Sequence, residues 1–371
     1  YSAKYLLHIS LFSTRIAKTY FSLKYTKGKI KLKILIDSKH GLGDCVQIIP
    51  MLQIIRDNYP DCYLAVIVRN KASRELLQAA SVTIDEYYYL DMQTITIKKL
   101  LALIVSLRHQ VFDYFIISPI STKWKAIIFA LLTGAKRCIG EQYQKMDKYQ
   151  IDNTVHMVER NLNLLRCICK IPDQKINPEL KVDKNSFTSI IKQDGIKIIG
   201  ICIGGGTAVV INHERIYPRK WSIEKIKLVI KNVLDYGYKV VLFGGQDEIK
   251  ELEHLSNILG HQNLYDFVGK TDIKESIILA AQCDLLIGVD TGMQHIADAV
   301  KTKTVSLFGP TNPLTHGAYS DKAVFIEADC KCEYKYCYGT NMYWQCKDRK
   351  CLNDISAEHV INKMLQEKVW K

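Results

Sequence analysis

Two glycine-containing turns carry the residues whose types and spacing suit chemistry on a phosphorylated ligand. The first is Gly41-Leu-Gly-Asp44 and the second is Asp290-Thr-Gly-Met-Gln-His295. The apolar run Cys283–Val289 precedes the second turn, and residues at helical spacing follow it. A strand–turn–helix of this kind points free N–H groups and the positive helix end at whatever lies above the turn. A diphosphate fits there, although Asp290 or Thr291 could equally cap an ordinary helix.

Asp44 is the candidate general base. It stands where the first expected strand passes into a helix N-terminus, which stabilises an ionised carboxylate. Such a group accepts a proton from an attacking hydroxyl, or else only caps its helix. Gly43, just before it, lets the backbone come close to a ligand.

Cations follow a further glycine turn in the C-terminal half. Gly204-Gly-Gly-Thr207 leads into a loop that ends in Arg219-Lys220-Trp221. Lys220 is placed to neutralise a leaving diphosphate, the role of a metal ion in other enzymes, and a solvated loop cation is the alternative. His295 is placed to reach a phosphate oxygen, although a helical histidine is more often structural.

The composition excludes several classes of protein. The chain has 371 residues, 48% of them apolar and 24% charged, which suits a globular protein with room for two domains. No apolar stretch approaches the ~20 residues that span a bilayer. Eight of the basic residues lie in residues 1–36 without an acidic one, so the net charge of +13 leaves +5 (13 minus 8) elsewhere. Neither a nucleic-acid motif nor a dehydrogenase or P-loop glycine pattern is present.

Alternating short apolar runs and amphipathic segments must position these residues. The alternation runs from Lys33 to Gly140 and again from Ile198 to Val305, with a linker at Pro172–Pro178. It predicts two doubly wound parallel α/β units. The second unit is expected to become irregular after Thr311.

The first 30 residues have a pattern of their own. Apolar side chains recur at helical spacing from Tyr5 to Leu23, and a lysine-rich tail follows. This predicts an amphipathic helix on an anionic membrane surface. A helix packed on the protein's own core and a partly disordered leader are the alternatives. Arg15 and Lys18 interrupt the apolar region, which disfavours a signal peptide.

Five of the twelve cysteines cluster late, at Cys330, Cys332, Cys337, Cys346 and Cys351. Their spacing lacks the paired C-x2-C knuckles of structural zinc sites. A packed loop of reduced thiols is the expectation, with disulfides or a metal as the alternatives.

An ordered series of motifs resembles glycosyltransferase family 9, the ADP-heptose:lipopolysaccharide heptosyltransferases. The series runs from about Lys31 to the C-terminus. Its pieces are Gly41-Leu-Gly-Asp44, Asn58-Tyr-Pro60, His156-x-Val-Glu-Arg-Asn161, Arg219-Lys-Trp221, Leu242-Phe-Gly-Gly245, Gly269-Lys-Thr271, Val289-Asp-Thr-Gly-x-x-His295 and Leu307-Phe-Gly-Pro-Thr311.

The resemblance implies a GT-B fold, with two Rossmann-like domains facing across a cleft. We expect a basic segment at residues 1–30, an acceptor domain at 31–175, a nucleotide-sugar domain at 176–355 that includes the cysteine-rich loop 330–351, and a final helix at 356–371. It also implies inverting transfer of heptose from ADP-heptose to a lipopolysaccharide core, with no metal and no cofactor.

The resemblance also assigns roles to individual residues. Asp44 would be the base, and Lys220 with Asp290, Thr291, Gly292 and His295 would hold the diphosphate and sugar. Thr207 and Asp247 match as possible phosphate and nucleoside contacts.

Departures from the family pattern keep two alternatives open. Gly41 and Leu42 stand where serine is frequent, the loop 207–217 is long, and the basic N-terminal segment is unusual. The alternatives are a related enzyme that uses another nucleotide sugar for capsule or O-antigen synthesis, and a non-catalytic nucleotide-sugar-binding protein. The expected location is cytoplasmic, on the inner face of a bacterial inner membrane, and no nucleic-acid partner is expected.

Overall fold

The computed structural model describes residues 31–121, 123–141, 154–183, 195–206, 209–211 and 214–367. The predicted basic segment at residues 1–30 lies outside these ranges, as does Thr207. Contacts divide the chain into residues 1–31 and 32–371, and both large sheets belong to the second unit.

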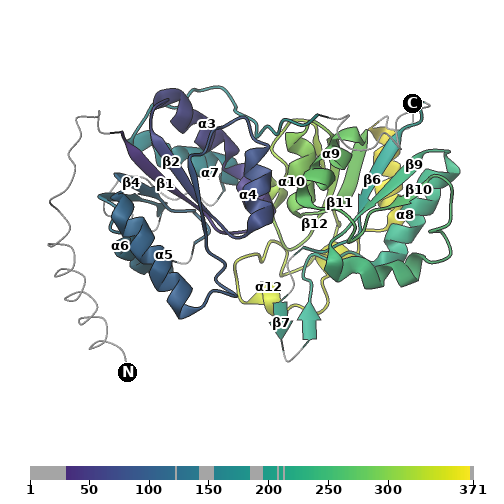
Figure 1. The fold of residues 1–371 in the computed structure, drawn as a ribbon. Helices are drawn as coiled ribbons and strands as arrows, with labels where there is room; N and C mark the ends of the chain where they lie inside the picture. The colour runs from purple at the N-terminus through teal and green to yellow at the C-terminus, as the bar shows by residue number, and fades with distance from the viewer. Residues whose placement is uncertain are drawn as a thin grey trace, which may run out of the picture. The chain divides into compact units, whose positions relative to one another are not determined.

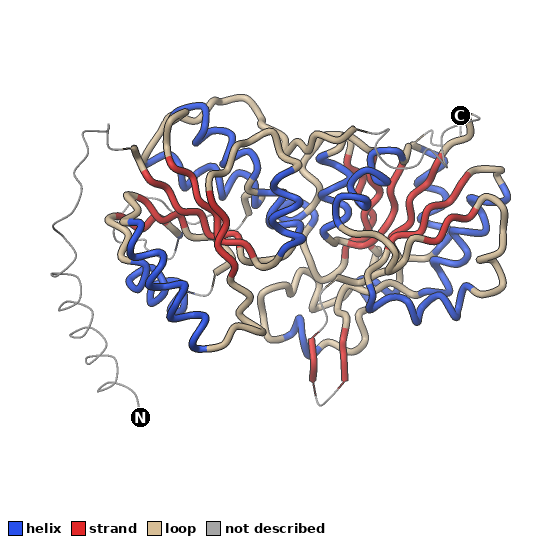
Figure 2. Tube along the Cα trace, in the orientation of Figure 1, coloured by secondary structure: helices blue, strands red, loops and turns tan. Residues whose placement is uncertain are grey.

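The N-terminal domain is built on a five-stranded parallel sheet in the order β3-β2-β1-β4-β5 (Figure 2). Its strands are β1 (Lys33–Ser38), β2 (Tyr63–Val68), β3 (Glu86–Tyr89), β4 (Tyr114–Ile116) and β5 (Arg137–Ile139). The central strands β1 and β2 are apolar along most of their length because helices cover both faces of a parallel sheet. The strand order reverses direction between β1 and β4, which is where open α/β sheets bind ligands.

The helices of this domain connect successive parallel strands. They are α2 (Leu42–Gln47), α3 (Ile49–Asn58), α4 (Lys71–Gln78), α5 (Ile97–Gln110), α6 (Lys123–Thr133), α7 (Met157–Asn163) and the 3-10 turn η2 (Leu164–Cys167). The apolar stripe from Val46 to Ile55 is divided at Ile48 between α2 and α3. Pro50 suits the first turn of α3, where its missing N–H costs no hydrogen bond.

The C-terminal domain repeats this architecture on a six-stranded parallel sheet in the order β10-β9-β6-β11-β12-β13. Its strands are β6 (Ile198–Cys202), β9 (Lys239–Phe243), β10 (Leu264–Asp266), β11 (Leu285–Val289), β12 (Lys303–Phe308) and β13 (Ala323–Glu327). Its helices are α8 (Ile223–Asp235), α9 (Ile273–Gln282), α10 (Gly292–Ala299), α11 (Pro313–His316), α12 (Met342–Gln345), α13 (Lys350–Asn353) and α14 (Ala357–Gln366).

Three parts of this domain differ from the sequence expectation. The loop after Gly206 contains the antiparallel hairpin β7 (Val209–Ile211) and β8 (Glu214–Ile216). The chain after Thr311 is not irregular throughout, because β13 joins the sheet as a partly exposed edge strand. The amphipathic segment after Gly245 is the 3-10 helix η3 (Gln246–Leu255) and not an α-helix. Apolar residues recur there at every third position, from Ile249 to Ile258, which matches three residues per turn.

A continuous apolar core joins the two domains. It runs from β1 and α3, through Leu52 and Leu76, to α9 and α10, where Ile277 and Ile296 are buried (Figure 1). Burial of this apolar core between the domains holds α2 against α10, so the first turns of these two helices are in contact. Within the described ranges, no helix combines the length and apolar composition that crossing a membrane requires.

Candidate active site

The two glycine turns singled out by the sequence meet where the domains join. A Cβ atom added to Gly43 would lie 2.7 Å from Cδ2 of His295, and one added to Gly292 would lie 3.0 Å from Cβ of Leu42. The close approach of α2 and α10 therefore leaves no room for a side chain at Gly43 unless the His295 ring moves, and little room for one at Gly292. The structure thus brings together Gly43, Asp44, Asp290, Gly292 and His295 from opposite halves of the sequence.

Asp44 lies in the first turn of α2 and is partly exposed. Its Oδ2 accepts a hydrogen bond of 2.8 Å from the backbone N–H of Gly41, the N-cap residue. The capping alternative is therefore realised, but through one oxygen. Among the described residues, its other oxygen has no hydrogen-bond partner. A carboxylate held in this way keeps one oxygen available for a proton.

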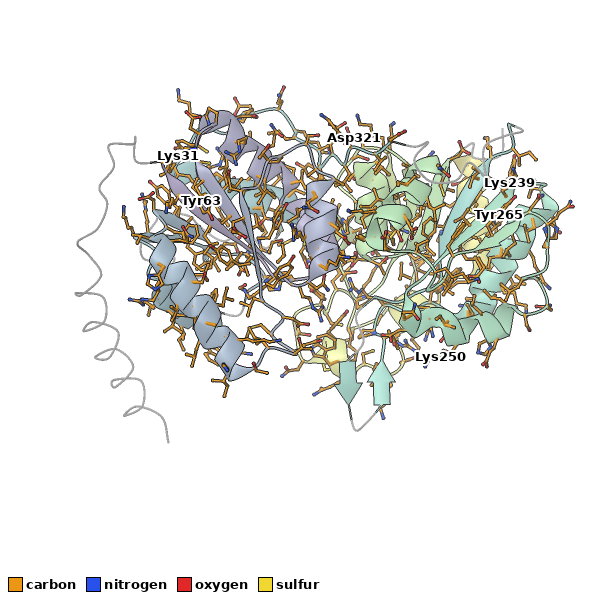
Figure 3. All side chains as sticks on the ribbon, in the orientation of Figure 1. Lys31, Tyr63, Lys239, Lys250, Tyr265 and Asp321 are labelled. Carbon is orange, nitrogen blue, oxygen red and sulfur yellow. The ribbon has the colours of Figure 1, made fainter. Side chains whose placement is uncertain are left out.

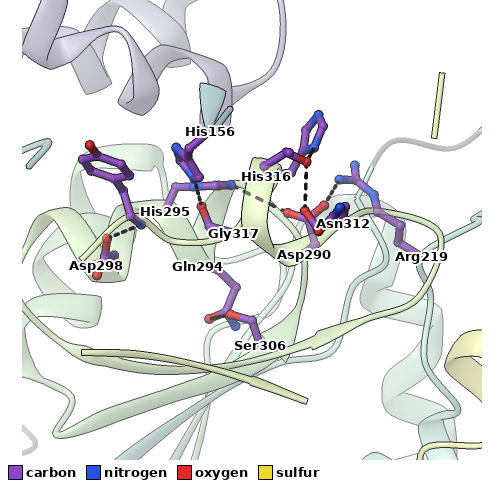
Figure 4. A network of polar contacts seen from close by, with 12 residues as sticks. His156, Arg219, Asp290, Gln294, His295, Asp298, Ser306, Asn312, His316 and Gly317 are labelled. Carbon is purple, nitrogen blue, oxygen red and sulfur yellow. Dashed lines mark hydrogen bonds and ion pairs between the residues drawn. The ribbon is translucent and has the colours of Figure 1, made fainter. Parts of the chain in front are cut away.

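Asp290 is a buried carboxylate between two cationic or potentially cationic groups, which approach it from opposite sides (Figure 4). Arg219 Nη1 donates to its Oδ2 at 2.9 Å, and His295 Nε2 lies 3.7 Å from its Oδ1. Burial acts to raise the pKa of Asp290, but Arg219, His295 and His316 outweigh it and hold that pKa well below the usual range. Asp290 therefore stays ionised and fixes both Arg219 and His295.

Thr291 is the N-cap residue of α10, with extended backbone and no side-chain cap. Gly292 follows as the first helical residue, so the free N–H groups of this helix end lie beside Asp44's turn. Buried Gln294 anchors the helix by accepting a hydrogen bond of 2.9 Å from Ser306 on β12. The turn is thus a rigid helix N-terminus of the kind that holds anions.

Lys220 is held apart from the Asp290 turn. Its ammonium pairs with Glu251 on η3, and its Nζ lies 5.7 Å from the centre of the Tyr217 ring. Gly205 packs against the Lys220 backbone so closely that an added Cβ would lie 2.6 Å from Cβ of Lys220. The cation that contacts Asp290 is instead its neighbour Arg219, which the sequence argument left without a role.

Asp247 lies on the wall of an open groove in the C-terminal domain. The groove is lined by Tyr217, Gln246, Asp247, Ile249, Lys250, Leu252, Glu253, Ser256 and Leu259. Lys250, labelled in Figure 3, belongs to the same helix, η3. Tyr217 connects the groove to Lys220 through the ring contact described above.

Three aromatic residues near the site were missed by the sequence argument. His316 and Tyr338 make a T-shaped ring contact with centroids 5.1 Å apart. Tyr338 makes a similar contact with Tyr343, with centroids 5.0 Å apart. Burial, with Asp44 nearby, raises the pKa of Tyr338 to about 12, so its hydroxyl remains a donor at neutral pH. The sequence feature that could have indicated this aromatic cluster is the group of five aromatic residues within 334–344, a segment noted above only for its cysteines. The five late cysteines, from Cys330 to Cys351, form no disulfide with one another.

His156 connects the domains outside the two turns. Its Nδ1 accepts from the N–H of Val158 at 3.1 Å, so Nε2 carries the proton and donates to the carbonyl of Gly317 at 3.0 Å. Its ring lies 4.7 Å from that of Tyr319. Burial lowers the pKa of His156 to about 4, so the ring is neutral at physiological pH.

A second polar cluster lies beside Asp44 at the end of β1. Buried Asp37 accepts hydrogen bonds from Lys39 and, at 2.8 Å, from Ser121. His40 lies 3.0 Å from the same serine hydroxyl. Burial lowers the pKa of His40. This cluster spans β1 and the segment after β4, the point where the sheet order reverses.

Comparison with known proteins finds relatives in one family. A model of glycosyltransferase family 9 (heptosyltransferase) matches residues 100–342, more than half of the chain. Lipooligosaccharide heptosyltransferase 2 of Campylobacter jejuni is 25% identical over 345 residues, which cover 90% of this chain and 98% of that protein. Lipopolysaccharide heptosyltransferase 2 of Escherichia coli is 27% identical over 183 residues, 46% of this chain and 50% of that protein.

Solved structures show the same fold. The structure of E. coli ADP-heptose lps heptosyltransferase II has a TM-score of 0.69 and 22% identity, over 91% of this chain and 99% of that one. The glycosyl transferase family 9 structure from Veillonella parvula has a TM-score of 0.73 and 19% identity, and the match covers 93% of this chain and 100% of that one.

The two parallel-sheet domains define a GT-B fold, which confirms the fold prediction. The chain belongs to glycosyltransferase family 9, and it is a glycosyltransferase.

Proposed function

We propose that this enzyme transfers heptose from ADP-heptose to a lipopolysaccharide core or a related lipid-linked saccharide, with inversion and without a metal. The observation that carries the proposal is the meeting of the Asp44 turn with the Asp290–His295 turn. It sets a carboxylate with a free oxygen opposite a helix N-terminus suited to a diphosphate. The curated relatives named above are heptosyltransferases of lipooligosaccharide or lipopolysaccharide.

In this mechanism the acceptor hydroxyl attacks the anomeric carbon from the face opposite the diphosphate. Asp44 takes the hydroxyl proton as the new carbon–oxygen bond forms and the bond to the diphosphate oxygen breaks. The departing ADP carries the electron pair of the broken bond. Its charge is stabilised by the N-terminus of α10, with His295 beside it, and by Lys220, while Arg219 holds Asp290 in place.

The nucleoside end of the donor is assigned to the C-terminal domain. Asp247 and the groove beside it would receive the nucleoside, and Lys220 would reach the diphosphate by exchanging its Glu251 partner for phosphate oxygens. Thr207 remains a proposed phosphate contact from the glycine turn. The acceptor would be presented at the cytoplasmic face of the inner membrane, with the basic segment 1–30 on the anionic surface.

A donor panel tests this assignment. Purified full-length enzyme and a heptose-deficient lipopolysaccharide acceptor are incubated with ADP-heptose, ADP-glucose, UDP-glucose or GDP-mannose, and nucleotide release is measured. We expect acceptor-dependent release of ADP from ADP-heptose. Turnover with a UDP- or GDP-sugar but not with ADP-heptose would instead assign the enzyme to capsule or O-antigen synthesis.

A further inference from the structure

Helices α5 and α6 cover one face of the N-terminal sheet and leave an apolar face outward. Their inner sides pack on the sheet, with Leu107 and Ala126 buried. Their outer sides carry two stripes at helical spacing, which we call the α5–α6 face. It consists of Ile97, Leu101 and Val105 on α5 and Trp124, Ile128 and Leu131 on α6.

The two stripes lie on adjacent helices. The two helices contact each other and lie side by side in Figure 1. Ile97 is 79% exposed, Leu131 is 70% exposed and Trp124 is 61% exposed. Single exposed apolar residues are ordinary, but a gathered group of this size marks an interaction surface.

The charges on these two helices are all of one sign. Neither α5 nor α6 contains an acidic residue, and Lys98, Lys99, Arg108 and Lys125 are exposed along them. Lys125 Nζ lies 5.4 Å from the centre of the Trp124 ring. Apolar stripes with lysines and an interfacial tryptophan suit an anionic lipid surface. A second copy of the chain would oppose the same positive charges to each other, which disfavours self-association through this face.

The position of the face connects it to the active site. In a parallel βα unit the helix begins near the carboxyl end of the preceding strand, so α5 and α6 begin at the edge where β3 and β4 end. Asp44 follows the carboxyl end of β1 at that same edge. Ile97 and Trp124, at the starts of the two helices, therefore lie at the catalytic edge of the sheet.

We infer that the α5–α6 face docks on an anionic lipid surface and holds the catalytic edge of the N-terminal domain toward that surface. The inference rests on the proposed function, in which the acceptor is lipid-linked. The apolar stripes enter the headgroup region while the lysines contact anionic headgroups. Lipid docking through this face is separate from any contribution of the basic segment 1–30, which every variant below retains.

Vesicle binding by the full chain tests the inference. Wild type, Leu101→Glu/Leu131→Glu and a control, Leu228→Glu, are floated with phosphatidylglycerol vesicles and with phosphatidylcholine vesicles. Leu228, on α8 of the other domain, is 56% exposed, which lies between the 47% of Leu101 and the 70% of Leu131. We expect wild type and control to bind phosphatidylglycerol, and the double variant to partition at least about tenfold more weakly. Unchanged thermal melting of the double variant would show that its fold is intact.

Three results would overturn the inference. Equal binding by the double variant would place the lipid contact elsewhere, for example on residues 1–30. A wild-type dimer dissolved by the double substitution, without vesicle binding, would make the face a contact between copies. Equal binding to neutral and anionic vesicles would remove the role of the lysines. Turnover of a lipid-free acceptor fragment is expected to be unchanged in the double variant, and absence of any transfer by wild type would refute the proposed function while leaving the binding result in place.

Discussion

Arg219 and His295 are the two partners of Asp290 in the turn at the start of α10. Without them Asp290 would be an unpaired buried carboxylate. Arg219 bonds one oxygen of Asp290, and His295 faces the other. Arg219 and Asp290 together carry almost no net charge. The attraction for a diphosphate therefore comes from the α10 N-terminus and from Lys220. Arg219 therefore orients Asp290, and Lys220, which is paired with Glu251, is the cation proposed to meet the diphosphate.

A double-mutant cycle measures the coupling of Arg219 and Asp290. Arg219→Gln removes one partner of a buried pair and should cost about 3–5 kcal/mol of unfolding free energy in urea titrations. Asp290→Asn alone should also destabilise the fold. The two substitutions together should cost less than their sum, by about 1–3 kcal/mol. Additive effects would show that the two groups do not support each other.

His156 predicts a pH dependence of stability. Burial lowers its pKa to about 4, whereas an unfolded histidine titrates near pH ~6.5. Between these values only the unfolded chain binds the proton, so the stability associated with His156 is complete above pH ~6.5 and is lost as the pH falls toward about 4. The full difference between the folded and unfolded pKa of His156 corresponds to ~3 kcal/mol of unfolding free energy.

The matched variant is His156→Asn, which retains a side chain able to cap α7. Urea unfolding at pH 7 and pH 4.5 should show wild type losing more stability than the variant on acidification, by about 1–3 kcal/mol. The same loss in both proteins would mean that His156 is not responsible.

At the scale of elements, the site depends on how closely α2 approaches α10. The apolar seam between the domains brings these helices together, and glycines at 43 and 292 allow their first turns to touch. The proposed base and the Asp290 turn are therefore positioned by the close packing of α2 on α10. A small displacement of α2 relative to α10 should therefore lower the rate of the transfer step.

Gly43→Ala tests this contact. Its Cβ would meet the buried His295 ring at 2.7 Å, so the helices must separate or the ring must turn. We expect a loss of about 1–3 kcal/mol in stability, and a transfer rate reduced by at least about tenfold. Gly260→Ala is the control, since no atom lies within 4 Å of its added Cβ. A Gly43→Ala enzyme with the wild-type rate would separate the contact from catalysis.

At the scale of the whole molecule, we propose that the two domains divide the transfer between them. The N-terminal domain supplies Asp44 and the proposed lipid-facing surface, and the C-terminal domain supplies the helix end and the groove of Asp247. In the proposed mechanism, Lys220 and the helix dipole of α10 take the role that a metal ion has in other enzymes.

Metal removal tests that division of labour. After treatment with EDTA, transfer from ADP-heptose should stay within about twofold of the untreated rate, because charge stabilisation of ADP comes from residues of the chain. Loss of activity that Mg²⁺ or Mn²⁺ restores would contradict metal independence.

The sequence predicted the repeating parts of the molecule well and the contacts between them poorly. The strands leading to Asp44 and Asp290 were found because buried parallel strands are short apolar runs. The pairing of Arg219 with Asp290 was missed, since it joins positions 71 residues apart and no local pattern encodes it. Edge strand β13 was missed because most of it is only partly buried.

Asp44→Asn tests the central claim most directly, because asparagine preserves the size of the side chain and can still accept the Gly41 N–H. The measurement pairs single-turnover transfer from ADP-heptose with the Kd for ADP. We predict transfer slower by about 10²–10⁴-fold, with the Kd for ADP within a few-fold of wild type. An Asp44→Asn enzyme that kept full turnover would contradict the role of Asp44 as the base and, with it, the proposed transfer site.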